Sequence, residues 1–149
     1  MESISLQPVT HDNWKAVAAI KLPPDQVGFV GPNVYSIAES KFEPHFSPRA
    51  IYDGDEVVGF LMYCPENDPP DPELFWFFRF VIKPELQQRG IGRQALQLAI
   101  EEMRLAGAAR IRTMHKPINQ VAGRLYAAAG FKKIGMLDDG DIEYELVHQ

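Results

Sequence analysis

Residues 73–106 read ELFWFFRFVIKPELQQRGIGRQALQLAIEEMRLA and contain the pattern that decides the fold. The apolar, aromatic-rich run 74–82 has the length and composition of a buried β-strand. After Pro84 comes a short loop with two closely spaced glycines, Gly90 and Gly92, and then apolar residues recur at helical spacing. A strand, a glycine-bearing loop and a helix in this order leave unpaired backbone N–H groups at the positive end of the helix dipole. The stretch therefore predicts a binding site for an anion such as a phosphate or pyrophosphate.

Length and composition indicate one folded domain over residues 1–149. Hydrophobic residues make up 46% of the chain and charged residues 23%, as is usual for a soluble globular protein. The net charge of −5 at pH 7 disfavours nucleic-acid binding, which requires a basic surface. We therefore expect a domain with no nucleic-acid partner.

Cysteine and histidine usage argues against a disulfide scaffold and against a metal site. Cys64 is a single cysteine and cannot form an intramolecular disulfide, and the histidines are scattered without ligand spacing: His11, His45, His115 and His148. The N-terminal segment is polar, unlike a signal peptide, and no apolar run approaches the roughly 20 residues that cross a bilayer. We expect a cytoplasmic protein with no membrane partner and no metal.

The rest of the chain alternates strand and helix patterns. Strands are predicted at 4–8, 49–52, 57–63, 110–115, 131–136 and 142–147, and helices at 14–20, 33–40 and 119–129. Asn33 is a possible helix N-cap, the turn Asp53-Gly54-Asp55 predicts a hairpin, and the acidic, proline-rich segment 65–72 predicts an exposed loop. The order β-α-α-β-β-β-α-β-α-β-β predicts one mixed sheet in a layered α/β or α+β domain.

Two motifs resemble those of the GNAT family of N-acetyltransferases. The first is the loop Gln87-Gln88-Arg89-Gly90-Ile91-Gly92, which matches that family's Q/R-x-x-G-x-G/A. The second is Asn119-x-x-Ala122-x-x-Leu125-Tyr126-x-x-x-Gly130-Phe131, which is similar to its N-x-x-A-x-x-L-Y-x-x-x-G-F. The predicted order of elements also agrees with the family, and the resemblance spans nearly the whole chain. It implies a mostly antiparallel central sheet flanked by helices, with a splayed pair of strands at the acetyl-CoA site.

The front half resembles the bacterial spermine/spermidine acetyltransferase branch, in segments 33–39, 48–52 and 58–63 and in Trp76-x-x-Arg79-Phe80. The resemblance implies direct acetyl transfer from acetyl-CoA to a primary amine, with a polyamine as acceptor and a homodimer as the assembly. An amino acid, an aminoglycoside-like antibiotic or a protein N-terminus are alternative acceptors, and a non-catalytic acyl-CoA sensor is an alternative function. The sequence departs from the branch at Phe78, where polyamine enzymes commonly carry a carboxylate.

The resemblance also implies roles for individual residues. The cofactor-binding set is Phe80, Val81, Ile82, Gln87, Gln88, Arg89, Gly90, Ile91, Gly92, Arg93, Asn119, Ala122 and Tyr126. Glycine at 90 and 92 lets the backbone approach a phosphate without an intervening Cβ. Tyr126 is the implied general acid that protonates the departing thiolate, and Glu39 is our choice for the carboxylate that deprotonates the amine. Structural alternatives are a core tyrosine at 126, a simple N-cap at Asn119 and a solvated glutamate at 39.

Overall fold

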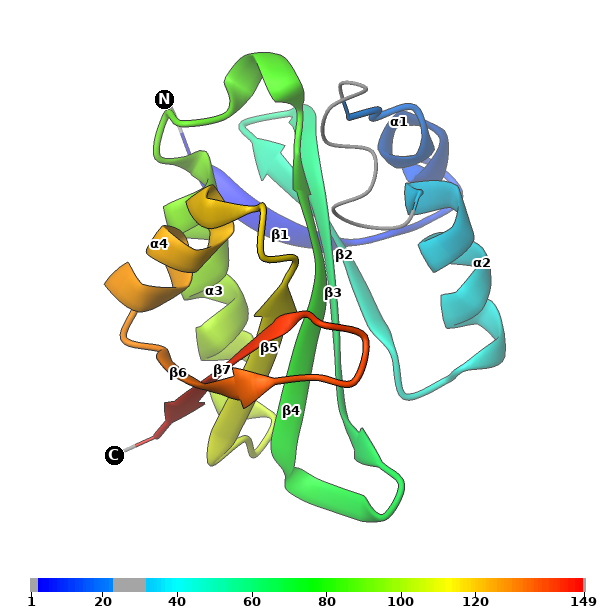
Figure 1. The fold of residues 1–149 in the computed structure, drawn as a ribbon. Coiled ribbons are helices and arrows are strands. Elements are labelled where there is room, and N and C mark those ends of the chain that lie inside the picture. Colours follow the sequence, from blue (N-terminus) through cyan, green and yellow to red (C-terminus); the bar gives the residue numbers. More distant parts are fainter. Residues whose placement is uncertain (1–2, 23–31, 149) are drawn as a thin grey trace.

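The computed structural model describes residues 3–22 and 32–148. Within them, seven strands form one sheet in the order β1-β2-β3-β4-β5-β7-β6 (Figure 1). The strands are β1 (Ile4–Pro8), β2 (Ser47–Asp53), β3 (Glu56–Asn67), β4 (Pro70–Ile82), β5 (Arg110–His115), β6 (Lys132–Met136) and β7 (Ile142–Val147). The pair β4–β5 is parallel and the other described pairs are antiparallel, which confirms a mixed, mostly antiparallel sheet.

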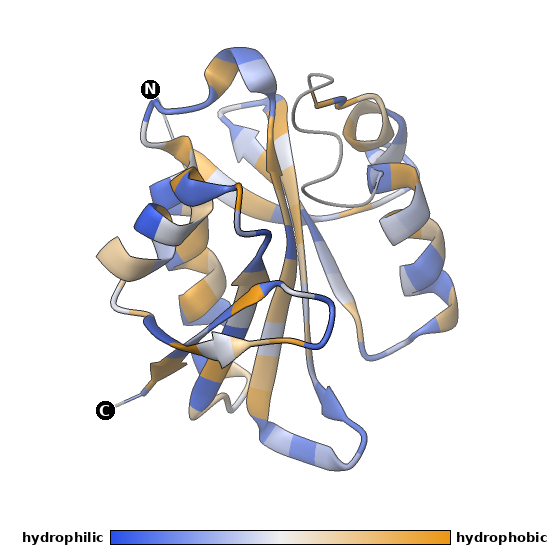
Figure 2. Cartoon of the chain, in the orientation of Figure 1, coloured by the Kyte–Doolittle hydropathy of each residue, from blue (hydrophilic) through white to orange (hydrophobic). Residues whose placement is uncertain are grey.

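Helices cover both faces of the sheet (Figure 1). Helices α1 (Trp14–Ala18) and α2 (Asn33–Phe42) lie on one face, and α3 (Ile91–Leu105) and α4 (Gln120–Ala128) on the other. Successive side chains of β3 point to opposite faces of the sheet. Phe60 and Met62 pack in the hydrophobic cluster under α1 and α2, and Leu61 and Tyr63 pack in the larger cluster under α3 and α4. Apolar residues accordingly concentrate in the central strands, which both layers bury (Figure 2).

The segment 65–72 is largely exposed, as predicted, but the prediction of a loop there is wrong. Strands β3 and β4 continue through most of this segment as a long hairpin arm, with Glu66 opposite Asp71. Two side-chain bonds tie the arm down: the Trp76 indole N–H donates to Glu66 Oε1 at 3.3 Å, and the Arg110 guanidinium donates to Asp71 Oδ2 at 3.1 Å. These bonds join residues far apart in the sequence, so the acidic, proline-rich composition did not indicate them.

Asn33 is not the N-cap of α2. Pro32 occupies the cap position, and Asn33 is the first helical residue. Its buried side chain donates instead to the Val17 carbonyl at 3.1 Å, which ties α2 to α1. Helix α1 is also shorter than predicted and ends at Ala18. Residues 23–31, between the predicted helices at 14–20 and 33–40, lie outside the described residues.

Candidate active site

Strands β4 and β5 separate partway along their length. Their parallel pairing covers four positions, from Leu74 opposite Arg110 to Phe77 opposite Thr113. Past these positions, β5 keeps only its pairing with β7, which runs along the whole of β5, while β4 runs on to Ile82 alongside β3. Within the described part of the chain, one edge of β4 is therefore free of a neighbouring strand over residues 78–82. This is the splayed strand pair that the family resemblance implies.

A β-bulge in β4 lies at the same point. The register with β3 shifts between the pairs Met62–Arg79 and Tyr63–Phe77, so Phe78 has no partner on β3. The bulge adds a residue to β4 and reorients the strand just where its β5 neighbour departs. Bulge and splay together shape this part of the sheet.

The alternation of an antiparallel ladder shows which backbone groups of β4 face the splay. Lys83 N–H donates to the Val58 carbonyl at 2.9 Å, so Val81 directs its own backbone groups toward β3. Phe80 and Ile82 then direct theirs toward the open side. Gln87 Nε2 donates to the Ile82 carbonyl at 3.1 Å. The Phe80 amide and carbonyl are thus placed to pair with an amide-bearing ligand that lies along the strand.

Helix α3 begins with exposed backbone donors. A short 3-10 turn (Pro84–Leu86) leads into the loop, and Gly90 is the N-cap with φ +86° and, among the described residues, no capping side chain. Gln88 also adopts a positive φ, +62°. Because Gly90 has no side chain that could accept a hydrogen bond from the first N–H groups of α3, these groups are available to an anion. The helix dipole adds to the attraction.

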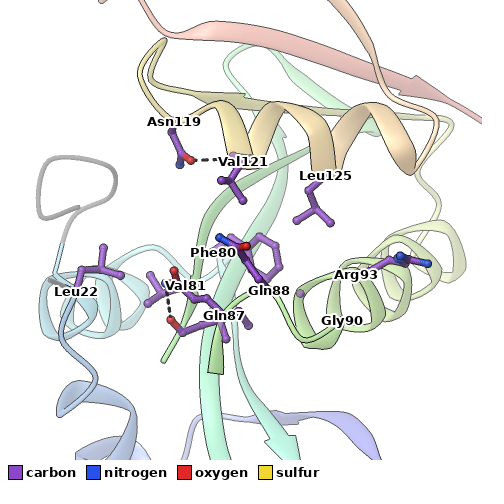
Figure 3. A pocket seen from close by; sticks show the side chains of 13 residues that line it. Leu22, Phe80, Val81, Gln87, Gln88, Gly90, Arg93, Asn119, Val121 and Leu125 are labelled. Carbon is purple, nitrogen blue, oxygen red and sulfur yellow. Dashed lines mark hydrogen bonds between the residues drawn. The ribbon is translucent and has the colours of Figure 1, made fainter. Parts of the chain in front are cut away.

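A cavity of about 390 Å³ joins these features (Figure 3). Ten of its lining residues belong to the predicted cofactor set: Phe80, Val81, Ile82, Gln87, Gln88, Gly90, Gly92, Arg93, Asn119 and Ala122. Three further lining residues were missed: Leu22, Val121 and Leu125. Val121 and Leu125 stand one helical turn apart on α4 and could have been found from that spacing, whereas no local signal marks Leu22.

Three members of the predicted set are not among the lining residues: Arg89, Ile91 and Tyr126, the last of which is described below. Ile91 is 3% exposed and packs in the α3–α4 core, and the Arg89 side chain lies exposed outside the lining. Their contribution to a ligand is then restricted to the backbone of the loop.

Asn119 has both of the roles considered for it. Its Oδ1 accepts a hydrogen bond from the Ala122 backbone N–H at 3.3 Å, so it caps α4 (Figure 3). Asn119 also lines the cavity, across from the loop that precedes α3. Capping fixes the orientation of the carboxamide, and its amino group remains a donor for a ligand.

Tyr126 lies in the core beside the splay. It is 4% exposed, and its ring packs against Phe77, Phe131 and Tyr144 at centroid distances of 6.4, 5.7 and 6.0 Å. Tyr126 is not among the residues found to line the cavity. Burial raises the pKa of Tyr126 to about 12, and a hydrogen bond with the Thr113 side chain acts in the opposite direction. The hydroxyl is therefore protonated at neutral pH, the state that a general acid requires.

Glu39 lies on the other face of the sheet from Tyr126, in α2 (Figure 1). Arg79 links it to the bulge: the guanidinium donates to Ser36 Oγ at 3.0 Å and to the Phe78 carbonyl at 3.2 Å, and lies 3.7 Å from Glu39 Oε1. This Glu39 oxygen is buried and has no hydrogen-bond partner among the described residues. The two predicted catalytic side chains are thus on opposite sides of the splay and are not in contact.

The Phe78 side chain lies at the bulge, on the face of the sheet that α1 and α2 cover. Its ring packs edge-on against Phe46 at 5.0 Å, and the Arg79 guanidinium lies 5.2 Å from its centroid. The position where polyamine enzymes commonly place an acid is therefore an aromatic surface covered by a cation.

Cys64 is buried in β3, and its environment makes it a poor nucleophile. Burial raises the pKa of the thiol to about 12, with smaller contributions from the charges of Glu66, Glu39 and Glu43.

Across residues 3–22 and 32–148, no three His, Cys, Asp or Glu side chains are placed to share a metal ion. In the same part of the chain, no helix has the length and apolar character needed to cross a membrane.

Comparison with known proteins identifies the family. The model of the acetyltransferase (GNAT) family matches residues 14–131. Spermine/spermidine N(1)-acetyltransferase of Bacillus subtilis (strain 168) is 29% identical over 140 residues, which cover 91% of this chain and 92% of that protein. The probable spermine N(1)-acetyltransferase of Bacillus subtilis subsp. natto (strain BEST195) matches equally well.

Solved structures show the same fold at low sequence identity. Aminoglycoside acetyltransferase AAC(6')-Ib in complex with coenzyme A has a TM-score of 0.83 at 17% identity, covering 99% of this chain and 96% of that one. The PaiA N-acetyltransferase of Thermoplasma acidophilum in complex with coenzyme A has a TM-score of 0.74 at 18% identity, with coverages of 98% and 99%. An acetyltransferase of Thermus thermophilus has a TM-score of 0.75 at 21% identity, covering 98% and 97%. With a family model that matches most of its length, the chain belongs to the acetyltransferase (GNAT) family.

Proposed function

We propose that this acetyltransferase moves an acetyl group from acetyl-CoA directly to a primary amine of a polyamine such as spermidine or spermine. The observation that carries the proposal is the cavity between the free edge of β4 and the uncapped start of α3. It offers a row of backbone groups for an amide-rich arm next to a cluster of backbone donors for a pyrophosphate. The relatives named as spermine/spermidine acetyltransferases support the choice of acceptor.

Different cavity residues would bind different parts of acetyl-CoA. The N–H groups of 88–93 would hold the pyrophosphate, with Arg93 as a cation on the same rim. The backbone groups of Phe80 and the N–H of Ile82 would pair with the pantetheine arm as an added strand does. A β4 amide facing the splay would then polarise the thioester carbonyl and stabilise the oxyanion that develops on it.

In the reaction, the neutral amine attacks the thioester carbonyl, a C–N bond forms and the C–S bond breaks. Tyr126 donates its hydroxyl proton to the departing thiolate, and a carboxylate or water takes the proton that the ammonium loses. Glu39 is the carboxylate we assign to this second proton, because Arg79 holds it beside the bulge with one unbonded oxygen. The buried, weakly acidic Cys64 supports direct transfer over a route through an acyl-enzyme.

The setting of the enzyme is part of the proposal. We take residues 1–149 as one domain that acts in the cytoplasm as a homodimer, with acetyl-CoA and a small amine as its ligands and without metal, nucleic acid or membrane. The net charge of −5 supports the absence of a nucleic-acid partner. Sedimentation equilibrium measures the assembly, and assays after chelator treatment test the metal-free proposal.

A thiol-release assay with acetyl-CoA and spermidine, lysine or kanamycin tests the function. We expect turnover with spermidine well above that with lysine or kanamycin. A preference for kanamycin or lysine would replace the polyamine with one of the other acceptors. Binding of acetyl-CoA without turnover of any amine would instead indicate the acyl-CoA sensor.

The variant Tyr126→Phe tests the acid. Loss of a positioned general acid should lower kcat on the order of 100-fold while the affinity for acetyl-CoA changes little. Tyr35→Phe is the matched control, since Tyr35 is 60% exposed on α2. Unchanged kcat in Tyr126→Phe would remove Tyr126 from the mechanism.

A further inference from the structure

Thr113 occupies the vertex of the splay. It is 1% exposed and is the last β5 residue to pair with β4. Its Oγ1 donates to the Phe77 carbonyl at 2.7 Å, a bond between buried groups. Thr113 also pairs with Tyr144 of β7, whereas Met114 and His115 pair with β7 but no longer with β4, so the side chain of Thr113 supplies a donor at the end of the β4–β5 ladder. A buried carbonyl is costly to leave unbonded, and this hydroxyl makes it possible for the strands to part here.

The Phe77 carbonyl is one of several near the splay that side chains occupy. The Phe78 carbonyl accepts from Arg79 and the Ile82 carbonyl accepts from Gln87, at 3.2 and 3.1 Å. Phe80 lies between these occupied carbonyls, with its own backbone groups directed at the cavity. The Thr113 bond therefore fixes one end of the short backbone segment that is left for a ligand.

Tyr126 is in contact with the same point. Its ring meets that of Phe77 at 87° and a centroid distance of 6.4 Å, so it stands edge-on to the residue whose carbonyl Thr113 binds. Thr113, Phe77 and Tyr126 belong to β5, β4 and α4, the three elements that meet where the splay begins. A shift of Thr113 would thus be transmitted both to the free edge of β4 and to the phenol.

We propose that Thr113 is a positioning residue for acetyl transfer, whose hydroxyl ends the β4–β5 ladder at Phe77 and holds Tyr126 at the vertex of the splay. The inference rests on the proposed function, because it assigns Thr113 an action through Tyr126. Thr113 touches neither substrate, and its effect is on the geometry in which the acid meets the thiolate.

Thr113→Ala and Thr113→Ser form the test pair, since both lose the methyl group and differ by the hydroxyl alone. We expect Thr113→Ala to lower kcat about tenfold with the KM for acetyl-CoA changed by less than about threefold, and Thr113→Ser to keep kcat within about twofold of wild type. Equal losses in both variants would overturn the proposal, since the methyl group would then be responsible. Should Thr113→Ala fail to fold, Thr113→Val keeps the volume and removes the hydroxyl.

A double-mutant cycle separates positioning from a general loss of structure. If Thr113 acts through Tyr126, the combination of Thr113→Ala with Tyr126→Phe should lower kcat no further than Tyr126→Phe alone. Losses that multiply would show that Thr113 acts independently of Tyr126 and would overturn the inference. Failure of the acid assignment looks different, because Tyr126→Phe by itself would then retain wild-type kcat.

Discussion

The two halves of the proposed site lie on opposite faces of the sheet and present different kinds of groups to a ligand. The cofactor half, between β4, α3 and α4, presents mainly backbone: the free edge of β4 and the uncapped N–H groups after Gly90. The acceptor half, beneath α2, presents side chains: the phenyl ring of Phe78 and the linked pair Arg79 and Glu39. Backbone groups recognise anions and amides of any origin, whereas side chains select a particular amine. If the proposed function holds, the fold sets the acetyl donor and a few substitutable side chains set the acceptor.

The largest effect should follow from filling the cofactor half. A Cβ at Gly92 would meet cavity-wall atoms of Phe80, Leu125 and Ile82 at 3.6 to 3.9 Å, so the protein can accept it while the ligand space shrinks. We expect Gly92→Val to lower acetyl-CoA affinity on the order of 100-fold, about 3 kcal/mol, with little change in Tm. Calorimetric titration and thermal unfolding measure the two quantities.

Gly123→Ala is the control for that variant. A Cβ at this α4 glycine would lie 2.9 Å from His115 Nε2 and 3.1 Å from Tyr144 Oη, in the core. It should lower stability by about 1–3 kcal/mol through overpacking. If Gly92→Val bound acetyl-CoA normally, or lost stability as Gly123→Ala does, the loop would not be the cofactor half of the site.

The next effect is the loss of stability at alkaline pH, to which buried Tyr126 contributes on the cofactor side. Its pKa is raised to about 12 in the folded protein, against about 10 in an unfolded chain. The contribution is present in full below pH 10 and is lost as the pH rises toward 12, for a total on the order of 3 kcal/mol. Tyr126→Phe should therefore lose less stability than wild type over that range.

Urea unfolding at several pH values between 8 and 12 measures this difference. Tyr35→Phe, which removes an exposed phenol, should follow the wild-type curve. Superimposable curves for Tyr126→Phe and wild type would mean that Tyr126 ionises as it does in water, and that the cofactor half is wetter than the structure indicates.

A smaller effect is expected in the acceptor half. Glu39→Gln removes the carboxylate that we assign to the proton of the amine, and should lower kcat/KM for spermidine about tenfold, or about 1.4 kcal/mol, without changing acetyl-CoA affinity. Glu43→Gln, at the exposed end of the same helix, is the matched control and should change that kcat/KM by less than about twofold. Equal kcat/KM values for the two variants would exclude Glu39 from the reaction of the amine and would move the acceptor half elsewhere.

The smallest effect concerns Cys64, also on the α2 side. A thiol pKa of about 12 leaves roughly one molecule in ten thousand as thiolate at pH 8. Iodoacetamide should modify the native protein very slowly and the urea-unfolded protein quickly, as mass spectrometry would show. Cys64→Ala should retain wild-type kcat, and a large loss would reopen the acyl-enzyme route.

The fold was predictable where local pattern and tertiary role coincide. The aromatic run of β4 and the glycine loop before α3 are both contiguous, and the structure keeps them as predicted. The hairpin arm was missed because one bond that holds it, between Arg110 and Asp71, joins residues 39 positions apart in the sequence. Asn33 was taken as a cap from its residue type, but a bond to Val17 in the preceding helix determines its role. The position of β7 between β5 and β6 likewise has no signature in hydrophobic period.

The candidate site divides in the same way. The places of Gly90 and Asn119 in the cavity wall were predictable because both are N-caps, at which local sequence favours such residues. Leu22 was not, since it follows α1 in irregular backbone and lines the cavity only through tertiary packing. The bonds of Arg79 to Ser36 and to the bulge also depend on tertiary packing, which a single sequence does not display.

The splay also bears on how fast the enzyme takes up its donor. Because Thr113 and Arg79 already satisfy the carbonyls where β4 and β5 part, no ladder bonds have to break to admit the pantetheine arm. A preformed groove of this kind removes the reorganisation step that slows many associations. Acetyl-CoA should therefore associate in a single phase whose observed rate rises linearly with concentration, with an association rate constant on the order of 10⁶ M⁻¹s⁻¹ or above.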